Sequence, residues 1–238
     1  MIRHLIKNVP FLYNAALAVK HKLWYKQTQT AVKKYLQEHH LHKLQLGAGQ
    51  NELPGWFNTD YFVRPSIYFL DVTKKFPFAD NTFTYVFSEH HIEHITYKQA
   101  RYMLSETYRV MKPGGYIKIT TPDLNQYIRA YAEGTLHNAI VKKHVKDWIY
   151  TGFAYAENYI PVDDEVYEAH FINDIFMNYE HRFIYDEKAL AKLAKNAGFT
   201  IINKALIKEM DFDHIESHIA DFDKLFTLYL YAQKPLNE

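Results

Sequence analysis

The chain has 238 residues, of which 48% are hydrophobic, 23% charged and 16% aromatic. This composition excludes a disordered, collagen-like or low-complexity chain, and the length fits one large domain or a domain with an appended segment. With 28 basic and 27 acidic residues, the overall charge indicates no polyanionic partner, and we expect no binding to nucleic acid. The absence of cysteine excludes disulfides, thiolate metal sites and a cysteine nucleophile, and it allows a cytoplasmic location.

The first 40 residues differ in charge from the rest of the chain. They contain seven Lys or Arg residues and one acidic residue, whereas residues 41–238 hold 21 basic and 26 acidic residues. Residues 12–40 lack Gly and Pro and have apolar residues at helical spacing, which predicts one or two helices. We therefore expect a basic helical arm, residues 1–40, and a domain, residues 41–238. The arm suits peripheral contact with an anionic inner membrane surface; packing against the domain or a second subunit is the alternative.

Short apolar segments follow the arm in a regular order. Strands are predicted at residues 43–46, 56–59, 66–70 and 84–88. Residues 97–111 predict a helix that Pro113 and the following glycines end, and a β-branched strand at 116–121 then stops at Pro122.

One irregular stretch precedes the last elements. Residues 122–185 are rich in aromatic residues and are interpreted as an insertion on the substrate side, whose rings form either core or a lid that stacks on sugars. Asp186 caps a helix that Gly198 ends, and residues 199–207 and 227–232 are predicted strands. Strands that alternate with helices predict an α/β fold with a mostly parallel sheet.

In such a sheet, ligands bind outside the carboxyl ends of the strands. The first three predicted strands are followed there by Gly47 to Gly49, Asp60 and Asp71. Glycine lets a backbone approach a ligand, a carboxylate suits two ribose hydroxyls, and a second acid could accept from an exocyclic amine, so an adenosine-containing ligand is favoured. The third glycine of the dinucleotide fingerprint is missing, and Asp60 lies only 11 residues beyond Gly49, which argues against a dinucleotide.

Six segments resemble the class I S-adenosylmethionine-dependent methyltransferases, in particular a bacterial branch associated with cell-surface polysaccharide biosynthesis. They are Leu46–Gly49, Gly55–Asp60, Phe76–Phe83, Ile92–His94, Met111–Gly115 and His181–Asp186. The resemblance implies a Rossmann-like, doubly wound sheet of seven strands, mostly parallel, with an antiparallel last strand. It also implies S-adenosylmethionine as cofactor, with Gly47 and Gly49 at the methionine moiety, Asp60 at the ribose and Asp71 at the adenine. Three further residues at these strand ends complete the predicted cofactor site: Ala48, Val72 and Ser88.

The segment 90–94, with the sequence HHIEH, is the candidate for catalysis. Residues i, i+3 and i+4 share a helix face, so His90, Glu93 and His94 would converge if this turn is helical. We predict that His94 is a general base without a metal, or else that the segment positions the acceptor.

A divalent cation at the same segment is a further alternative that is not favoured. Its ligands would be His90, Glu93 and His94, with His170 or His181 as a fourth.

Methyl transfer to a hydroxyl is an in-line displacement, in which an enzyme mainly supplies proximity and alignment. A sugar hydroxyl is a poor nucleophile, and a histidine with a pKa of about 6–7 would help to remove its proton. The sequence therefore predicts O-methylation of a saccharide or glycan-linked acceptor. A methyltransferase of another small molecule, or a non-catalytic binding module with this fold, is the alternative; the retained Asp60 and Asp71 argue against the module.

Overall fold

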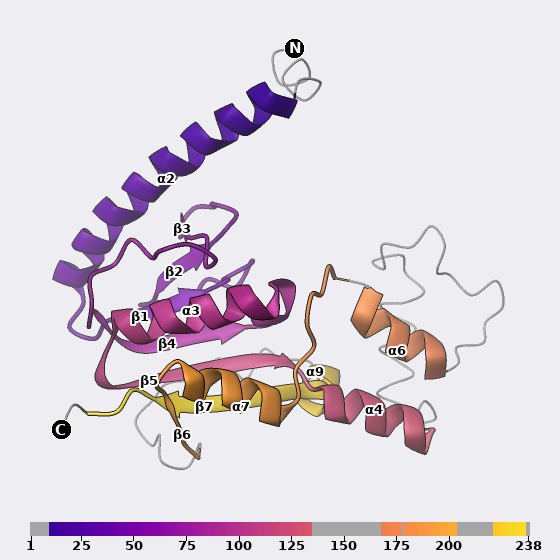
Figure 1. Ribbon diagram of the computed structural model, residues 1–238. Coiled ribbons are helices and arrows are strands. Elements are labelled where there is room, and N and C mark those ends of the chain that lie inside the picture. The colour runs from indigo at the N-terminus through magenta and orange to yellow at the C-terminus, as the bar shows by residue number, and fades with distance from the viewer. Residues whose placement is uncertain (1–9, 135–167, 178, 204–220, 237–238) are drawn as a thin grey trace.

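The computed structural model describes residues 10–134, 168–177, 179–203 and 221–236 (Figure 1). Its centre is a seven-stranded sheet in the order β3-β2-β1-β4-β5-β7-β6. The strands are β1 Lys43–Leu46, β2 Phe57–Asp60, β3 Ile67–Phe69, β4 Phe83–Glu89, β5 Met111–Pro122, β6 Thr200–Ile201 and β7 Thr227–Gln233. Strands β1 to β5 pair in parallel, and β7 runs antiparallel to both β5 and β6. The predicted α/β fold, including its antiparallel last strand, is confirmed.

Helices α3, Tyr97–Val110, and α7, Glu187–Asn196, cover one face of this sheet (Figure 1). Thr96 begins α3 with a capping box, and the Asp186 carboxylate accepts from the backbone of α7 at 2.7 Å. The apolar faces of both helices pack on the central strands in one main core. The strand predicted at 199–207 is described only in its first part, because residues 204–220 lie outside the described ranges.

Strand β5 begins earlier than the sequence predicts. It starts at Met111, directly after α3, so the Pro-Gly-Gly segment 113–115 lies inside the strand and not in a turn. The register with β4 shifts here, as in a β-bulge, where a strand tolerates proline and glycine. A Cβ on Gly115 would lie 2.7 Å from the Thr84 carbonyl oxygen, so the close approach of the two strands requires glycine.

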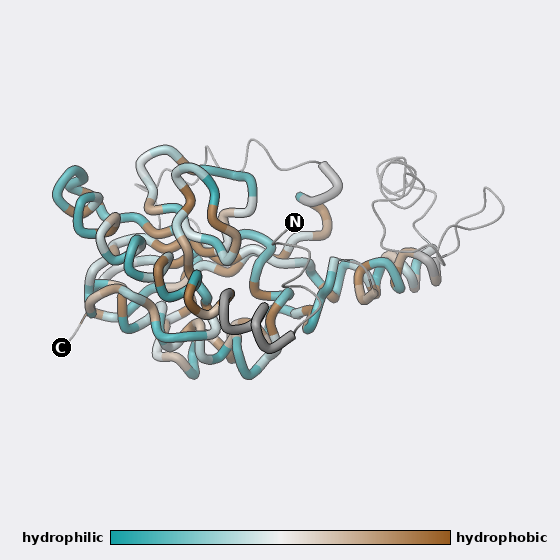
Figure 2. The backbone as a smooth tube through the Cα atoms, turned by 90° about the horizontal axis from the view of Figure 1, so that it is seen from above, coloured by the Kyte–Doolittle hydropathy of each residue, from teal (hydrophilic) through white to brown (hydrophobic). Residues whose placement is uncertain are grey.

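The stretch predicted to be irregular contains two helices, α4 Leu124–Glu133 and α6 Glu168–Met177. Both lie beyond the carboxyl end of β5 and project from the sheet, as the view from above also shows (Figure 1, Figure 2). With α9, Asp221–Phe226, they form a second core. Its buried residues are Tyr127, Ala130, Phe171, Ile175, Ile184 and Phe226. Within the stretch 122–185, Tyr127 and Phe171 thus belong to this second core and Tyr185 to the main core, whereas residues 135–167 lie outside the described part.

The described part of the basic arm, residues 10–40, contains one helix, α2, Pro10–Glu38. The Thr28 hydroxyl donates to the Phe69 carbonyl at 2.9 Å, and the Trp24 ring lies 5.7 Å from the Phe69 ring, so this half of α2 packs along the edge strand β3. The N-terminal turns extend past the sheet (Figure 1), and Val19 and Leu23 are 61% and 57% exposed. No helix within the described ranges is long and apolar enough to cross a membrane.

Candidate functional site

The glycine loop after β1 is tied to Asp60 at the end of β2. The Gly49 N–H donates to Asp60 Oδ2 at 2.9 Å, and the Phe62 N–H donates to Oδ1 at 2.8 Å. These residues meet because β1 and β2 are parallel neighbours whose carboxyl ends lie side by side. Each carboxylate oxygen can accept two hydrogen bonds, so Asp60 retains acceptor capacity for the hydroxyl groups of a ligand.

The two glycines of this loop have different surroundings. Both adopt left-handed backbone angles, with φ of 70° at Gly47 and 56° at Gly49. A Cβ on Gly49 would have no atom within 4 Å, whereas a Cβ on Gly47 would lie 2.4 Å from His91 Cγ. The space beside Gly49 is therefore open to a ligand, and the space beside Gly47 holds the His91 ring.

His91 is a site residue that the sequence analysis did not select. The residue is half-buried, and its Nε2 atom is buried without a hydrogen-bond partner. Burial lowers the pKa of His91, an effect that the nearby charges of Glu93 and Asp60 oppose, so the ring is neutral at pH 7. An unpartnered polar atom beside the glycine loop marks a place where a ligand can form a hydrogen bond.

The turn after β4 is not the α-helical turn that we predicted. It is a short 3-10 helix, η1, Ile92–His94, and His90 before it is left-handed with a φ of 42°. His90 still meets Glu93, since its Nδ1 lies 3.3 Å from Glu93 Oε1, while its Nε2 contacts the Thr227 hydroxyl at 3.1 Å. The helical-face argument missed His91 because it assumed a regular α-helix through residue 90.

Glu93 is fully buried, with 0% of its surface exposed. The Thr121 hydroxyl donates to its Oε2 at 3.0 Å. Burial alone would raise the pKa of Glu93, but the contact with His90 and the proximity of His94 outweigh it, so the pKa is lowered and the carboxylate is ionised at pH 7. Burial, together with this negative charge, raises the pKa of the Tyr185 hydroxyl.

His181 approaches the same turn from the segment before α7. Its ring centroid lies 4.9 Å from that of His94, and among the described residues the ligand atoms of Glu93, His94 and His181 approach within 4.8 Å of one another. Burial lowers the pKa of His181, which keeps its imidazole neutral at pH 7. Of the residues in the metal alternative, the structure brings Glu93, His94 and His181 into this cluster, while His90 contacts Glu93 from outside it. The side chain of His170 lies outside the described residues.

The other predicted cofactor residues occupy the expected strand ends. Asp71 follows β3, but its Oδ1 accepts from the Thr73 N–H at 2.9 Å and from the Thr73 hydroxyl at 2.6 Å, so it caps its own loop. Ala48, Val72 and Ser88 are buried, and the Ser88 hydroxyl has no hydrogen-bond partner. Contact of Asp71 with an adenine stays a prediction.

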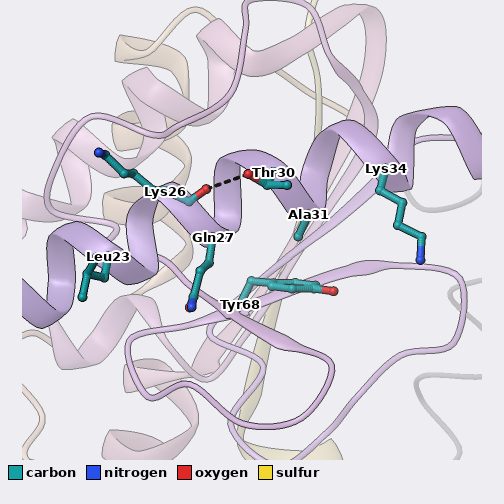
Figure 3. Close-up of a pocket in the computed structure, with 7 residues that line it drawn as sticks. All are labelled: Leu23, Lys26, Gln27, Thr30, Ala31, Lys34 and Tyr68. Carbon is teal, nitrogen blue, oxygen red and sulfur yellow. Dashed lines mark hydrogen bonds between the residues drawn. The ribbon is translucent and has the colours of Figure 1, made fainter.

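Two hollows lie along α2. One, of about 340 Å³, is lined by Asp71 together with His21, Lys22 and Tyr25 of the helix. The other, of about 530 Å³, lies against β3, with the Tyr68 ring beneath Ala31 (Figure 3). Neither includes the glycine loop or the histidine turn, and the first shares Asp71 with the predicted cofactor residues.

A sequence family described as "Methyltransferase domain" matches residues 63–119, which cover β3, β4, α3 and most of β5. No curated protein matches the chain.

Solved methyltransferase structures overlay on most of the chain at low identity. A S-adenosylmethionine-dependent methyltransferase from Archaeoglobus fulgidus is 13% identical, with a TM-score of 0.45 and coverage of 95% of this chain and 100% of that chain. One from Thermotoga maritima is 16% identical, with a TM-score of 0.43 and coverage of 97% and 99%. Likenesses this weak carry no argument about the substrate.

The strand order with its antiparallel β7 is that of a Rossmann-like methyltransferase fold, and residues 63–119 match a methyltransferase domain. The G-x-G loop and the acid after β2 lie at the carboxyl edge of this sheet, where such a fold binds S-adenosylmethionine. The residues present fit that cofactor. Gly49 borders open space, Asp60 has acceptor capacity for the ribose hydroxyls, and the buried His91 Nε2 offers a further polar contact. None of the comparisons bears on the bacterial polysaccharide branch.

Proposed function

We propose that the protein transfers a methyl group to a hydroxyl of a saccharide or glycan-linked acceptor, with assistance from His94. The observation that carries this proposal is the position of His91, which bridges two halves of the site. Its ring packs on Gly47 of the cofactor loop, and it interacts electrostatically with Glu93 and His94 of the turn. The histidine turn and the cofactor loop are therefore neighbours in space.

S-adenosylmethionine, when bound, supplies an electrophilic methyl group. A hydroxyl must lose its proton as its oxygen takes up that group, and a ring nitrogen of His94 accepts this proton. A carboxylate oxygen of the buried Glu93 lies within 4.8 Å of a His94 ring nitrogen, so a negative charge stands beside the ring that takes up the proton.

A saccharide acceptor is supported by two aromatic rings beside the histidines. Tyr97 and Phe183 are 38% and 36% exposed, and their ring centroids lie 5.0 Å apart. Tyr97 begins the helix that follows the His94 turn, and Phe183 follows His181 by two residues. Partly exposed rings next to a proton acceptor suit the apolar face of a sugar ring whose hydroxyls point inward.

Incubation with methyl-labelled S-adenosylmethionine and fractionated glycans from the source organism tests this proposal. We expect label on a saccharide hydroxyl with the wild-type protein, and at least about 10²-fold less with His94→Ala. His40→Ala is the matched control, because His40 is an exposed histidine remote from the turn in sequence. Label on a different small molecule would contradict a saccharide acceptor. Cofactor binding without any methyl transfer would contradict the proposed activity and favour the non-catalytic binding module.

We also propose that residues 19–26 of α2 contact the cytoplasmic surface of an anionic membrane. Lys20, Lys22 and Lys26 are exposed beside the exposed Val19 and Leu23. Each basic residue near anionic lipid contributes about 1 kcal/mol, so three of them suffice for salt-sensitive binding.

Vesicle co-sedimentation at low and high salt tests the membrane contact. We expect binding to phosphatidylserine vesicles at low salt, its loss in K20E/K22E, and its retention in K192E/K195E, which carries the same charge change on α7. Equal recovery in the supernatant with and without anionic lipid would contradict the proposal.

A further inference from the structure

One carboxylate and two imidazoles form a cluster where the turn after β4 meets the segment before α7. The ligand atoms of Glu93, His94 and His181 all lie within 4.8 Å of one another. Glu93 is fully buried, and both histidines are half-buried. Three nitrogen and oxygen donors from two separate segments are thus brought together at the carboxyl edge of the sheet.

Backbone hydrogen bonds hold these two segments together. The N–H groups of Arg182 and Phe183 donate to the Glu93 carbonyl at 2.7 and 3.2 Å. Tyr185 is tied in turn to the end of β5, because its carbonyl accepts from the Leu124 N–H at 2.9 Å. The position of His181 relative to the turn is therefore set by the main chain and not by side-chain contacts alone.

The protonation of His181 follows from its neighbour. Its Nδ1 lies 2.6 Å from the Ile175 carbonyl oxygen. A carbonyl oxygen can only accept, so Nδ1 carries the proton and Nε2 has a lone pair to offer. A backbone carbonyl on one ring nitrogen is a usual partner for a histidine whose other nitrogen binds a metal.

The second oxygen of Glu93 is unsatisfied. Thr121 donates to Oε2, but Oε1 makes no hydrogen bond. His90 Nδ1 approaches Oε1 to 3.3 Å without hydrogen-bond geometry, so that contact is electrostatic and orients the carboxylate. Beyond its contact with His90, this buried oxygen therefore has unused acceptor capacity.

We propose that Glu93, His94 and His181 bind a divalent cation of the zinc type. Two imidazole nitrogens and one carboxylate oxygen are a donor set that zinc prefers, and three protein ligands leave a fourth position for an oxygen from outside. The centre of an equilateral triangle with 4.8 Å edges lies about 2.8 Å from each corner, against roughly 2.0–2.2 Å for bonds from zinc to these donors. Small side-chain rotations would close that difference.

The fourth position around the cation connects this site to the proposed function. Binding of an acceptor hydroxyl at that position rests on the proposed function. An acceptor hydroxyl bound there would lie beside the cofactor loop, and the ion would lower its pKa so that solvent water can take its proton. With the ion bound, His94 acts as a ligand, and it accepts the proton itself only in the metal-free protein. Binding of the ion itself does not depend on the identity of the acceptor.

Cobalt titration of the chelator-treated full chain tests the proposal. Co²⁺ at a site with four ligands gives visible absorption bands, and Zn²⁺ should displace it. We expect one equivalent to bind to the wild type, and His181→Ala to weaken binding by at least about 100-fold. His90→Ala should weaken it by about 10–100-fold, as expected for a residue that orients a ligand, and His40→Ala should leave it unchanged.

Far-ultraviolet circular dichroism shows whether each variant is folded, and His181→Gln, which keeps the side-chain size, replaces His181→Ala if the latter unfolds. Absence of a saturable cobalt spectrum in the wild type, or equal binding by the folded His181 variant, would overturn the site. Chelator-resistant methyl transfer without cobalt binding refutes the metal site and leaves the proposed function. Cobalt binding without methyl transfer refutes the proposed function and leaves the metal site.

Discussion

The two sides of the carboxyl edge of the sheet are built differently. On the β1–β2 side, Gly49 and Asp60 are joined by a hydrogen bond between consecutive, adjacent strands. On the β4 side, Glu93 and His94 depend on Thr121 of β5 and on His181, which comes much later in the chain. The cofactor side is thus specified by local sequence, and the histidine side requires a distant segment to be in place. Variants on the two sides should therefore have separable effects on cofactor affinity and turnover.

The largest separation is expected for His94→Ala. Loss of the proton acceptor should lower turnover by about 10²–10⁴-fold and leave the affinity for S-adenosylmethionine within about twofold of the wild type. Initial-rate kinetics together with a binding titration measure both quantities. Wild-type kcat and KM in this variant would remove His94 from the chemistry.

Replacement of Gly47 and Gly49 by alanine compares two positions of the cofactor loop by their effect on stability. The Cβ of Gly47→Ala overlaps the buried His91 ring, and we expect a loss of about 2–4 kcal/mol in the free energy of unfolding. Gly49→Ala meets no neighbouring atom, so only its left-handed backbone opposes it, at about 1–2 kcal/mol. Urea unfolding of both variants measures these losses of stability. A smaller loss for Gly47→Ala than for Gly49→Ala would mean that the His91 ring does not pack against Gly47.

On the histidine side, Thr121→Val removes the donor to Glu93 Oε2 and keeps the side-chain shape. A hydrogen bond to a buried charge contributes about 1.5–3 kcal/mol, and we expect a loss of that size. Urea unfolding of the wild type and Thr121→Val measures this loss of stability. An unchanged midpoint and slope would mean that the Glu93 carboxylate does not depend on Thr121.

The smallest effect is expected for Tyr185→Phe. The buried Tyr185 hydroxyl has no hydrogen-bond partner, so its removal should change stability by less than about 1 kcal/mol or increase it slightly. Thermal unfolding is sufficient to measure this. A large loss of stability would show that the hydroxyl has a partner in the folded protein.

The sequence predicted the cofactor side more completely than the histidine side. The first four strands lie within one or two residues of their predicted positions, because each is a short apolar run followed by a glycine or an acid. Strand β5 was predicted to begin five residues late, at residue 116, since a Pro-Gly-Gly segment in a bulge has the same local pattern as one in a turn. Local patterns find elements but do not show which strands bulge.

The histidine side depends on features that no local pattern encodes. The left-handed His90 changes the direction of the chain, so His91 and not His90 packs on the glycine loop. His181 was considered only as a fourth ligand, because nothing in its own segment shows that main-chain hydrogen bonds bring it to Glu93. Helix α6 could have been found from Phe171 and Ile175, apolar residues one turn apart that enter the second core.

Calorimetric titration of S-adenosylmethionine into the wild type and Asp60→Ala tests the central claim most directly. The claim is that the cofactor binds at the β1–β2 side through the Asp60 carboxylate. Hydrogen bonds from ribose hydroxyls to a carboxylate contribute about 1.5–3 kcal/mol each, so we predict one site in the wild type and at least roughly tenfold weaker binding in a folded Asp60→Ala protein. Absence of binding to the wild type, or equal affinity in the folded Asp60→Ala variant, would contradict the account.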